Sequence, residues 1–77
     1  SLRLEAIVIC MAGNVSNYDM FYRVHAENFG WMGWAKNGES AGTEGMGLRL
    51  EGIQIMVVPK DSAAPGSTAF PFMSSLN

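Results

Sequence analysis

The segment LRLEAIVI at residues 2–9 returns as LRLEGIQI at residues 48–55, with six of its eight residues unchanged. Two copies offset by 46 residues in a 77-residue chain indicate a repeat. We interpret residues 1–11 as the closing strand of a preceding unit, residues 12–58 as one complete unit, and residues 59–77 as a Pro- and Ser-rich linker or tail. We therefore expect the chain to be a piece of a longer repetitive protein.

Size and composition limit how such a unit can be stabilised. A 77-residue domain has a marginal core, and the single cysteine, Cys10, excludes an internal disulfide. One histidine and no cysteine pair argue against a metal site or other cofactor, so neighbouring repeats or self-association are the expected source of stability. A net charge of −2 argues against nucleic-acid binding, and the longest apolar run, residues 6–12, is too short to insert in a membrane.

Period-2 patterns predict strands at residues 20–26, 31–35 and 48–58. In the last of these the apolar face switches at Gly52, which favours either a β-bulge or close backbone contact there, or a strand buried on both faces. Asn37-Gly38 predicts a type I′ turn, after which a brief strand near Ser40 pairs back on Trp34 and Ala35. No stretch has a helical period, so the fold class is all-β and antiparallel.

Trp31 and Trp34 are the main candidates for ligand binding. Their spacing of three residues places them on opposite faces of a strand, so we expect one indole in the core and the other nearer the surface. An exposed indole is a platform for stacking on a sugar ring; the alternative is that both are buried and anchor a small core. Tyr22 and Asn37 complete the candidate ligand-binding set.

A second group of residues is expected to be structural. His25 is interpreted as a hydrogen-bonding residue that holds the loop after Thr43. Arg49 and Glu51 share one face, and a reciprocal Arg–Glu pair between adjacent strands is expected from them, with a solvated rim as the alternative. The same two residues recur in the first copy of the repeat as Arg3 and Glu5.

Catalysis is not expected from this chain. Cys10 and His25 are residue types that form nucleophilic pairs, but Cys10 aligns with Met56 in the repeat and so occupies an ordinary apolar position. The glycine-rich segment 42–47 lies between predicted strands, where turn geometry explains it better than phosphate binding.

The order of short motifs resembles one known family. Tyr22, Val24 and His25 are followed by GWMGW at 30–34, NG at 37–38, AGTEG at 41–45 and LRLEGIQI at 48–55. This arrangement resembles the clostridial hydrophobic repeat with conserved tryptophan, the ChW repeat. The departures are Ala26-Glu27, where the family usually has Val-Gln, and Met32, which replaces a common polar residue. These departures do not affect the tryptophans or the glycines of the motif. Any role that the family's Gln has is in doubt here, because Glu27 occupies its position.

The resemblance implies a secreted or cell-surface protein of a Gram-positive anaerobe, with non-catalytic repeats that often occur in threes. Grouping in threes favours a β-prism or β-trefoil-like fold, completed by strand exchange or homo-oligomerisation. For this chain, residues 2–10 are the segment expected to pair with another copy, and a homotrimer would mimic three tandem repeats. The resemblance implies a role in cell-surface or extracellular interaction. With the exposed aromatic of the Trp31/Trp34 pair as a platform, we expect binding of cell-surface or plant polysaccharide. The alternative is a structural repeat that spaces or assembles other domains.

Overall fold

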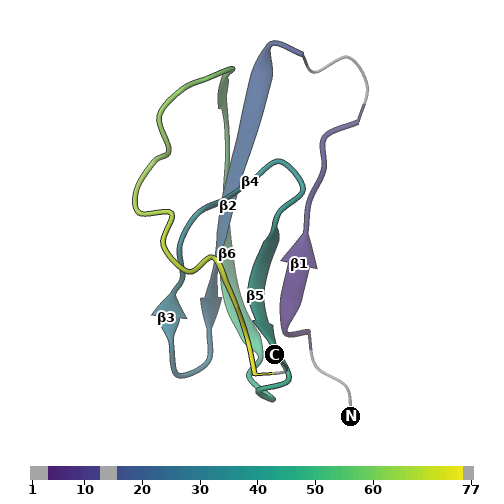
Figure 1. The fold of residues 1–77 in the computed structure, drawn as a ribbon, viewed down its shortest axis with the longest axis vertical. Helices are drawn as coiled ribbons and strands as arrows, with labels where there is room; N and C mark the ends of the chain where they lie inside the picture. Colours follow the sequence, from purple (N-terminus) through teal and green to yellow (C-terminus); the bar gives the residue numbers. More distant parts are fainter. Residues whose placement is uncertain (1–3, 13–15, 76–77) are drawn as a thin grey trace.

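The computed structural model describes residues 4–12 and 16–75, and these form an all-β fold without a helix (Figure 1). The expected fold class is therefore confirmed as all-β. In the described ranges no helix is of a length and apolarity that would span a bilayer. The strands are β1 (Ala6–Val8), β2 (Tyr18–Ala26), β3 (Gly30–Trp31), β4 (Ala35–Lys36), β5 (Ser40–Glu44), β6 (Leu50–Pro59) and β7 (Phe72–Ser74).

The larger sheet is built around β2, which pairs with β6 along its whole length and with β3 and β4 on its other edge. The predicted strands at 20–26 and 48–58 are confirmed with small shifts at their ends. The predicted third strand at 31–35 is divided in two, because residues 32–34 leave the ladder between β3 and β4.

A β-bulge interrupts the pairing of β2 with β6. His25 lies opposite Gly52, but Ala26 lies opposite Leu50, so Glu51 is the extra residue. The bulge explains why the apolar pattern changes face beside Gly52, as the sequence predicted. The alternative of a strand buried on both faces is wrong, because Ile53 and the apolar residues that follow it on β6 are largely exposed.

The second sheet has the order β1–β5–β7 and is mixed, because β5 pairs antiparallel with β1 but parallel with β7. Strand β7 belongs to the segment 59–77, which was expected to be a linker or tail without a strand. That expectation is wrong at Phe72–Ser74. Pro71 lacks an amide hydrogen, but its carbonyl accepts a hydrogen bond from Gly42 N (2.9 Å) and so guides the tail onto β5.

The core is formed by the inner face of β2 and the residues of neighbouring strands that meet it. Tyr22 is fully buried at its centre, and its hydroxyl donates to Glu39 O and accepts from Ile9 N (3.3 Å). A buried tyrosine is stabilising only when its hydroxyl is paired, and here the pairing joins three segments of the chain. The buried cluster consists of Met20, Tyr22, Val24, Ala26, Met32, Ala35 and Ala41.

The turn at Asn37-Gly38 connects the two sheets. Both residues have positive φ (39° and 85°), as a type I′ turn requires, and Glu39 N donates to Lys36 O (3.1 Å). The prediction of this turn is confirmed. The prediction that the next strand pairs back on Trp34 and Ala35 is wrong: β5 crosses to the second sheet, where Ala41 lies opposite Ile7.

The two copies of the repeat are both extended, but they have different partners. The first copy forms β1 on β5, whereas the second forms β6 on β2. As equivalent closing strands of successive units, the two copies should supply the same edge to a β assembly; within one chain this is wrong, because each uses a different edge. The two copies contact each other where Leu50 N donates a hydrogen bond to Leu4 O (3.0 Å), just before β1.

Candidate functional site

Three exposed aromatic side chains surround a shallow groove on the outer side of the larger sheet. Phe29 and Trp31 come from the β2–β3 hairpin, and Phe70 comes from the tail that crosses over it. The groove has a volume of about 290 Å³. It is lined by Arg23, Phe29, Trp31, Met32, Gly33, Ser67, Ala69, Phe70 and Met73. An open groove with aromatic walls and one cationic side chain is the most ligand-like surface described in this chain.

The guanidinium of Arg23 organises this surface. Its Cζ lies 4.7 Å from the ring centroid of Trp31 and 4.9 Å from that of Trp34, and its Nε donates to Gln54 Oε1 (2.6 Å). Cation–π contacts of this kind hold the rings in place as well as the cation. Arg23 was not predicted as a site residue from the sequence. The alternation of β2 already placed it on the same face of the strand as Phe21 and His25, which was the available signal.

Trp31 is supported on two further sides. The His25 ring meets it edge-on, with centroids 5.2 Å apart and an interplanar angle of 89°. On another side the ring lies against Gly52 beside the bulge, where a Cβ would be 3.4 Å from Cη2 of the indole. The ring is therefore fixed before any ligand arrives, and 43% of the residue remains exposed.

Trp34 is buried, with 6% of its surface exposed, so the expectation of one core and one surface indole is confirmed. The alternative that both indoles are buried is wrong. The argument from opposite strand faces does not hold, since residues 32–34 are not in a strand and both rings contact Arg23. The tail covers Trp34: its N donates to Ser67 O (2.9 Å), and Gly66 lies against its Nε1 edge.

The other two candidate ligand-binding residues lie elsewhere. Tyr22 has no exposed surface, so the expectation that it contacts a ligand is wrong in this fold. The side chain of Asn37 is committed to the protein, because its Oδ1 accepts from Met20 N (2.8 Å) and its Nδ2 donates to Asp19 Oδ1 (3.0 Å). Neither residue lines the aromatic groove.

The predicted structural residues are only partly brought together. His25 Nδ1 lies 3.2 Å from Glu51 Oε1, so the imidazole faces the bulge rather than the loop after Thr43. Arg49 Nε lies 3.9 Å from Glu51 Oε2 within the same strand region, and both side chains are well exposed. Arg49 and Glu51 thus contact each other within one copy, as on a solvated rim. Reciprocal pairing between the two copies also involves Arg3 and stays a prediction.

The first copy of the motif behaves differently. Glu5 Oε1 accepts from Gly47 N (3.1 Å), and Arg3 lies outside the described residues. Thr43 is 1% exposed on β5, and its buried Oγ1 has no hydrogen-bond partner among the described residues. It contributes its backbone instead, since Thr43 N donates to Glu5 O (2.8 Å).

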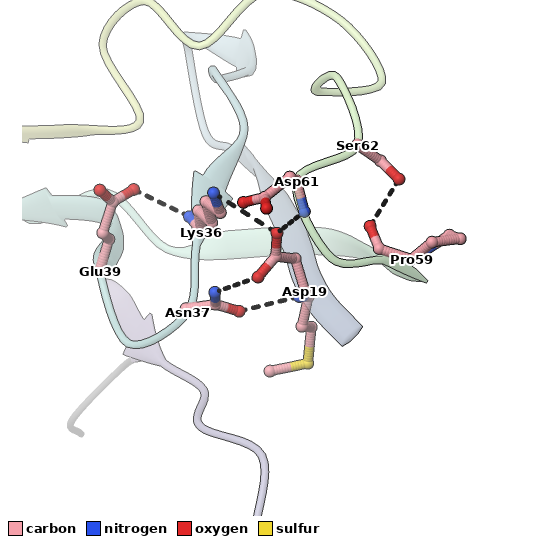
Figure 2. Close-up of polar contacts among 8 residues, drawn as sticks. Asp19, Lys36, Asn37, Glu39, Pro59, Asp61 and Ser62 are labelled. Atoms are coloured by element: carbon pink, nitrogen blue, oxygen red, sulfur yellow. Dashed lines mark hydrogen bonds and ion pairs between the residues drawn. The ribbon is translucent and has the colours of Figure 1, made fainter. Parts of the chain in front are cut away.

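Asp19, near the start of β2, carries a buried carboxylate (Figure 2). Its Oδ2 accepts from Asp61 N (2.8 Å) and lies 3.5 Å from Lys36 Nζ, while Oδ1 accepts from Asn37 Nδ2. These contacts, the Asp61 amide first, lower the pKa of Asp19 below its ordinary value of 3.8. The carboxylate joins β2, the turn after β4 and the start of the tail, which is a structural role.

The two residues weighed as a nucleophilic pair, Cys10 and His25, lie apart in the structure. No three of their His, Cys, Asp and Glu side chains are grouped as metal ligands. Cys10 is exposed beside Gly38, at the turn that bonds to Met20, whereas His25 lies near the other end of β2 beside Trp31.

Residues 25–59, just under half of the chain, match the family model described as ChW, Clostridial hydrophobic W. The match begins at His25 in β2 and ends at Pro59, where β6 ends, so it contains both tryptophans, the turn at Asn37-Gly38 and the bulge. The resemblance found from the sequence is confirmed over these residues. No curated protein and no solved structure matches the chain.

Proposed function

Starting from the presence of a ChW repeat at residues 25–59, we propose that this chain is a non-catalytic, extracellular module that binds cell-surface or plant polysaccharide. The observation that carries the proposal is the exposed, pre-positioned indole of Trp31 in a groove with two further exposed aromatic rings. The family resemblance supports a secreted or surface-displayed location in a Gram-positive anaerobe. The binding chemistry is argued from the groove alone.

A sugar ring has an apolar face of C–H groups and a polar rim of hydroxyls. Trp31 offers a flat apolar surface of matching size, and Arg23 offers donors at the edge of the same groove. Phe29 and Phe70 extend the apolar surface on either side. The open form of the groove suits a segment within a polymer better than a small molecule that must be enclosed.

The test is a titration of the full chain with cell-wall and plant polysaccharide preparations, followed by tryptophan fluorescence and calorimetry. We expect a fluorescence change in the wild type that is lost in Trp31→Ala, while the buried Trp34 still reports an intact fold. Phe70→Ala should weaken binding. Tyr18→Ala is the matched control, because Tyr18 is also an exposed aromatic residue but lies outside the groove. Binding that is equally strong in Trp31→Ala and the wild type would contradict this site.

A second candidate function is a structural repeat that spaces or assembles other domains. It is favoured by the apolar edge of β6 that no other strand of the described ranges pairs with. In this case the units would close into a β-prism or β-trefoil-like arrangement of tandem repeats or of separate chains. Absence of any response to polysaccharide in a folded chain, together with self-association, would favour this function over the first.

A further inference from the structure

One edge of β6 has no neighbouring strand among the described residues, although the strand is ten residues long. Val24 lies opposite Ile53 but accepts a hydrogen bond from Met32 N (2.9 Å) on the other side of β2, so its backbone groups point away from β6. Opposite residues of an antiparallel pair either face each other or both face away, in alternation. Ile53, Ile55 and Val57 therefore direct their backbone groups to the free edge.

The side chains of the same residues are also uncovered. Ile53, Ile55 and Val57 are 47%, 51% and 58% exposed, although their partners on β2 include the buried Val24 and Tyr22. They thus lie on the face of the sheet that forms the core, at a point where nothing described in this chain covers them. A long, apolar, unpaired edge is a template for another strand.

Strand β1 shows how a copy of this segment binds to β5. Thr43 N donates to Glu5 O (2.8 Å) and Gly38 N donates to Ile9 O (3.0 Å), so Glu5, Ile7 and Ile9 direct their backbone groups to β5. The side chains of Ile7 and Ile9 pack against the core cluster.

The repeat relates these two edges residue by residue. Ile7 corresponds to Ile53 and Ile9 to Ile55 in the aligned copies. The residues with which β1 binds β5 are therefore the equivalents of those that β6 leaves unpaired. Conversely, β6 pairs with β2 through its other edge. The equivalent edge of β1 has no strand beside it in the described part of the chain. Taken together, the two copies show how one strand of this sequence can pair along both of its edges, with β5 on one edge and β2 on the other.

The close contact at Gly42 fits both copies. Gly42 has a φ of 124° and lies opposite Ala6, and a Cβ at Gly42 would be 2.7 Å from the Cα of Ala6. Position 42 therefore has to be a glycine, whose missing side chain lets the backbone of the partner strand approach this closely. The equivalent of Ala6 in β6 is Gly52, which is smaller still.

We propose that β6 binds β5 of a second copy of this unit in the register that β1 has in this chain, with Ile53 opposite Ala41 and Gly52 opposite Gly42. In a tandem array the β6 strand of each unit would then be shared between two units. It would pair with β2 of its own unit along one edge and with β5 of the next unit along the other. The contact is head-to-tail, so it continues until the units close into a ring. It involves none of the aromatic groove and stands independently of polysaccharide binding.

An apolar hollow of about 260 Å³ separates the first copy of the repeat from the beginning of the free edge of β6. It is lined by Leu4, Ile7, Leu50, Glu51, Gly52 and Ile53. Within one chain the first copy caps β5, so self-association requires β1 to be displaced. Weakening β1 should therefore increase association rather than reduce it.

The first test uses the full chain with Ile7→Lys, which places a charge where β1 meets the core. We expect sedimentation velocity to show concentration-dependent oligomers, with association increased by roughly tenfold or more over the wild type. Adding Ile53→Lys should abolish the increase. Adding Gln54→Lys, on the other face of the same strand, should not. A folded Ile7→Lys variant that remains monomeric, or equal association of Ile7→Lys with and without Ile53→Lys, would overturn the proposal.

The second test does not depend on folding of the Ile7→Lys variant. Gln54 corresponds to Val8, which lies opposite Ser40, and positions 40 and 54 belong to different sheets of one chain. In a Cys10→Ser background, the pair Ser40→Cys and Gln54→Cys should form disulfides between chains on mild oxidation. The control pair Ser40→Cys and Met56→Cys keeps the same face of the strand but is two residues out of register, and should react roughly tenfold more slowly. Equal rates for the two pairs would overturn the proposed register.

Discussion

The guanidinium of Arg23 lies over the indole of Trp31, with Cζ 4.7 Å from the ring centroid, and also contacts the ring of Trp34. One guanidinium thus contacts both the exposed Trp31 of the groove and the buried Trp34 beneath the tail. The link makes Arg23 a positioning residue for Trp31.

Replacing Arg23 with Met should keep most of the side-chain packing and remove the charge. We expect the free energy of unfolding to fall by about 1–2 kcal/mol, because two cation–π contacts and the bond to Gln54 are lost. Chemical denaturation monitored by circular dichroism measures this. Arg23→Lys should rescue only part of the loss, since an ammonium cannot stack on both rings as a planar guanidinium does. Equal stability of Arg23→Met and wild type would show that the contacts contribute nothing.

Gly42→Ala should be among the most damaging single substitutions. The new Cβ would meet the backbone of Glu5 and Ala6, and φ at this position is 124°. We expect a loss of about 2–4 kcal/mol, measured by thermal or chemical unfolding. Gly47→Ala is the matched control: its φ is also positive, at 68°, but its Cβ would enter open space, so about 1 kcal/mol should be lost. Similar losses in the two variants would mean that contact with β1 is unimportant at Gly42.

Asp19 predicts an acid-sensitive contribution to stability. Because its pKa is lowered in the folded state, chiefly by the Asp61 amide, the ionised form stabilises the fold at pH values above the ordinary pKa of 3.8. This contribution is lost as the pH falls below 3.8 through the lower pKa of the folded state. Asp19→Asn should therefore be less stable than wild type at neutral pH, and the difference should shrink on acidification. Denaturation midpoints between pH 7 and pH 2 test this; a constant difference across that range would contradict it.

Thr43 carries a buried hydroxyl that finds no hydrogen-bond partner in the part of the chain that the structure describes. Replacing it with Val keeps the shape and removes a polar group that gains nothing from burial, so Thr43→Val should be neutral or stabilising by up to about 1 kcal/mol. Thr43→Ser keeps the hydroxyl but removes the methyl, and should destabilise by about 1 kcal/mol. Thermal unfolding of both variants separates the two effects. Marked destabilisation by Val would reveal a role for the hydroxyl.

Local patterns in the sequence determined the long strands β2 and β6, the bulge beside Gly52 and the turn at Asn37-Gly38, because alternation, small residues and left-handed φ are properties of neighbouring residues. The same patterns named Trp31 as a candidate site residue. Only the tertiary structure decided that Trp31 is the exposed indole, that Arg23 lies against it, and that Tyr22 is inaccessible. These outcomes depend on which strands meet and on what the tail covers.

Two further features were likewise decided by contacts between distant segments. Strand β7 exists because β5 offers an edge to the tail, a condition that the Pro-rich residues 59–77 do not encode by themselves. The two copies of the repeat have six of eight residues in common, yet one binds β5 and the other β2. A strand has two edges and its sequence specifies a fit to both, so its partner depends on which neighbour the rest of the fold places within reach.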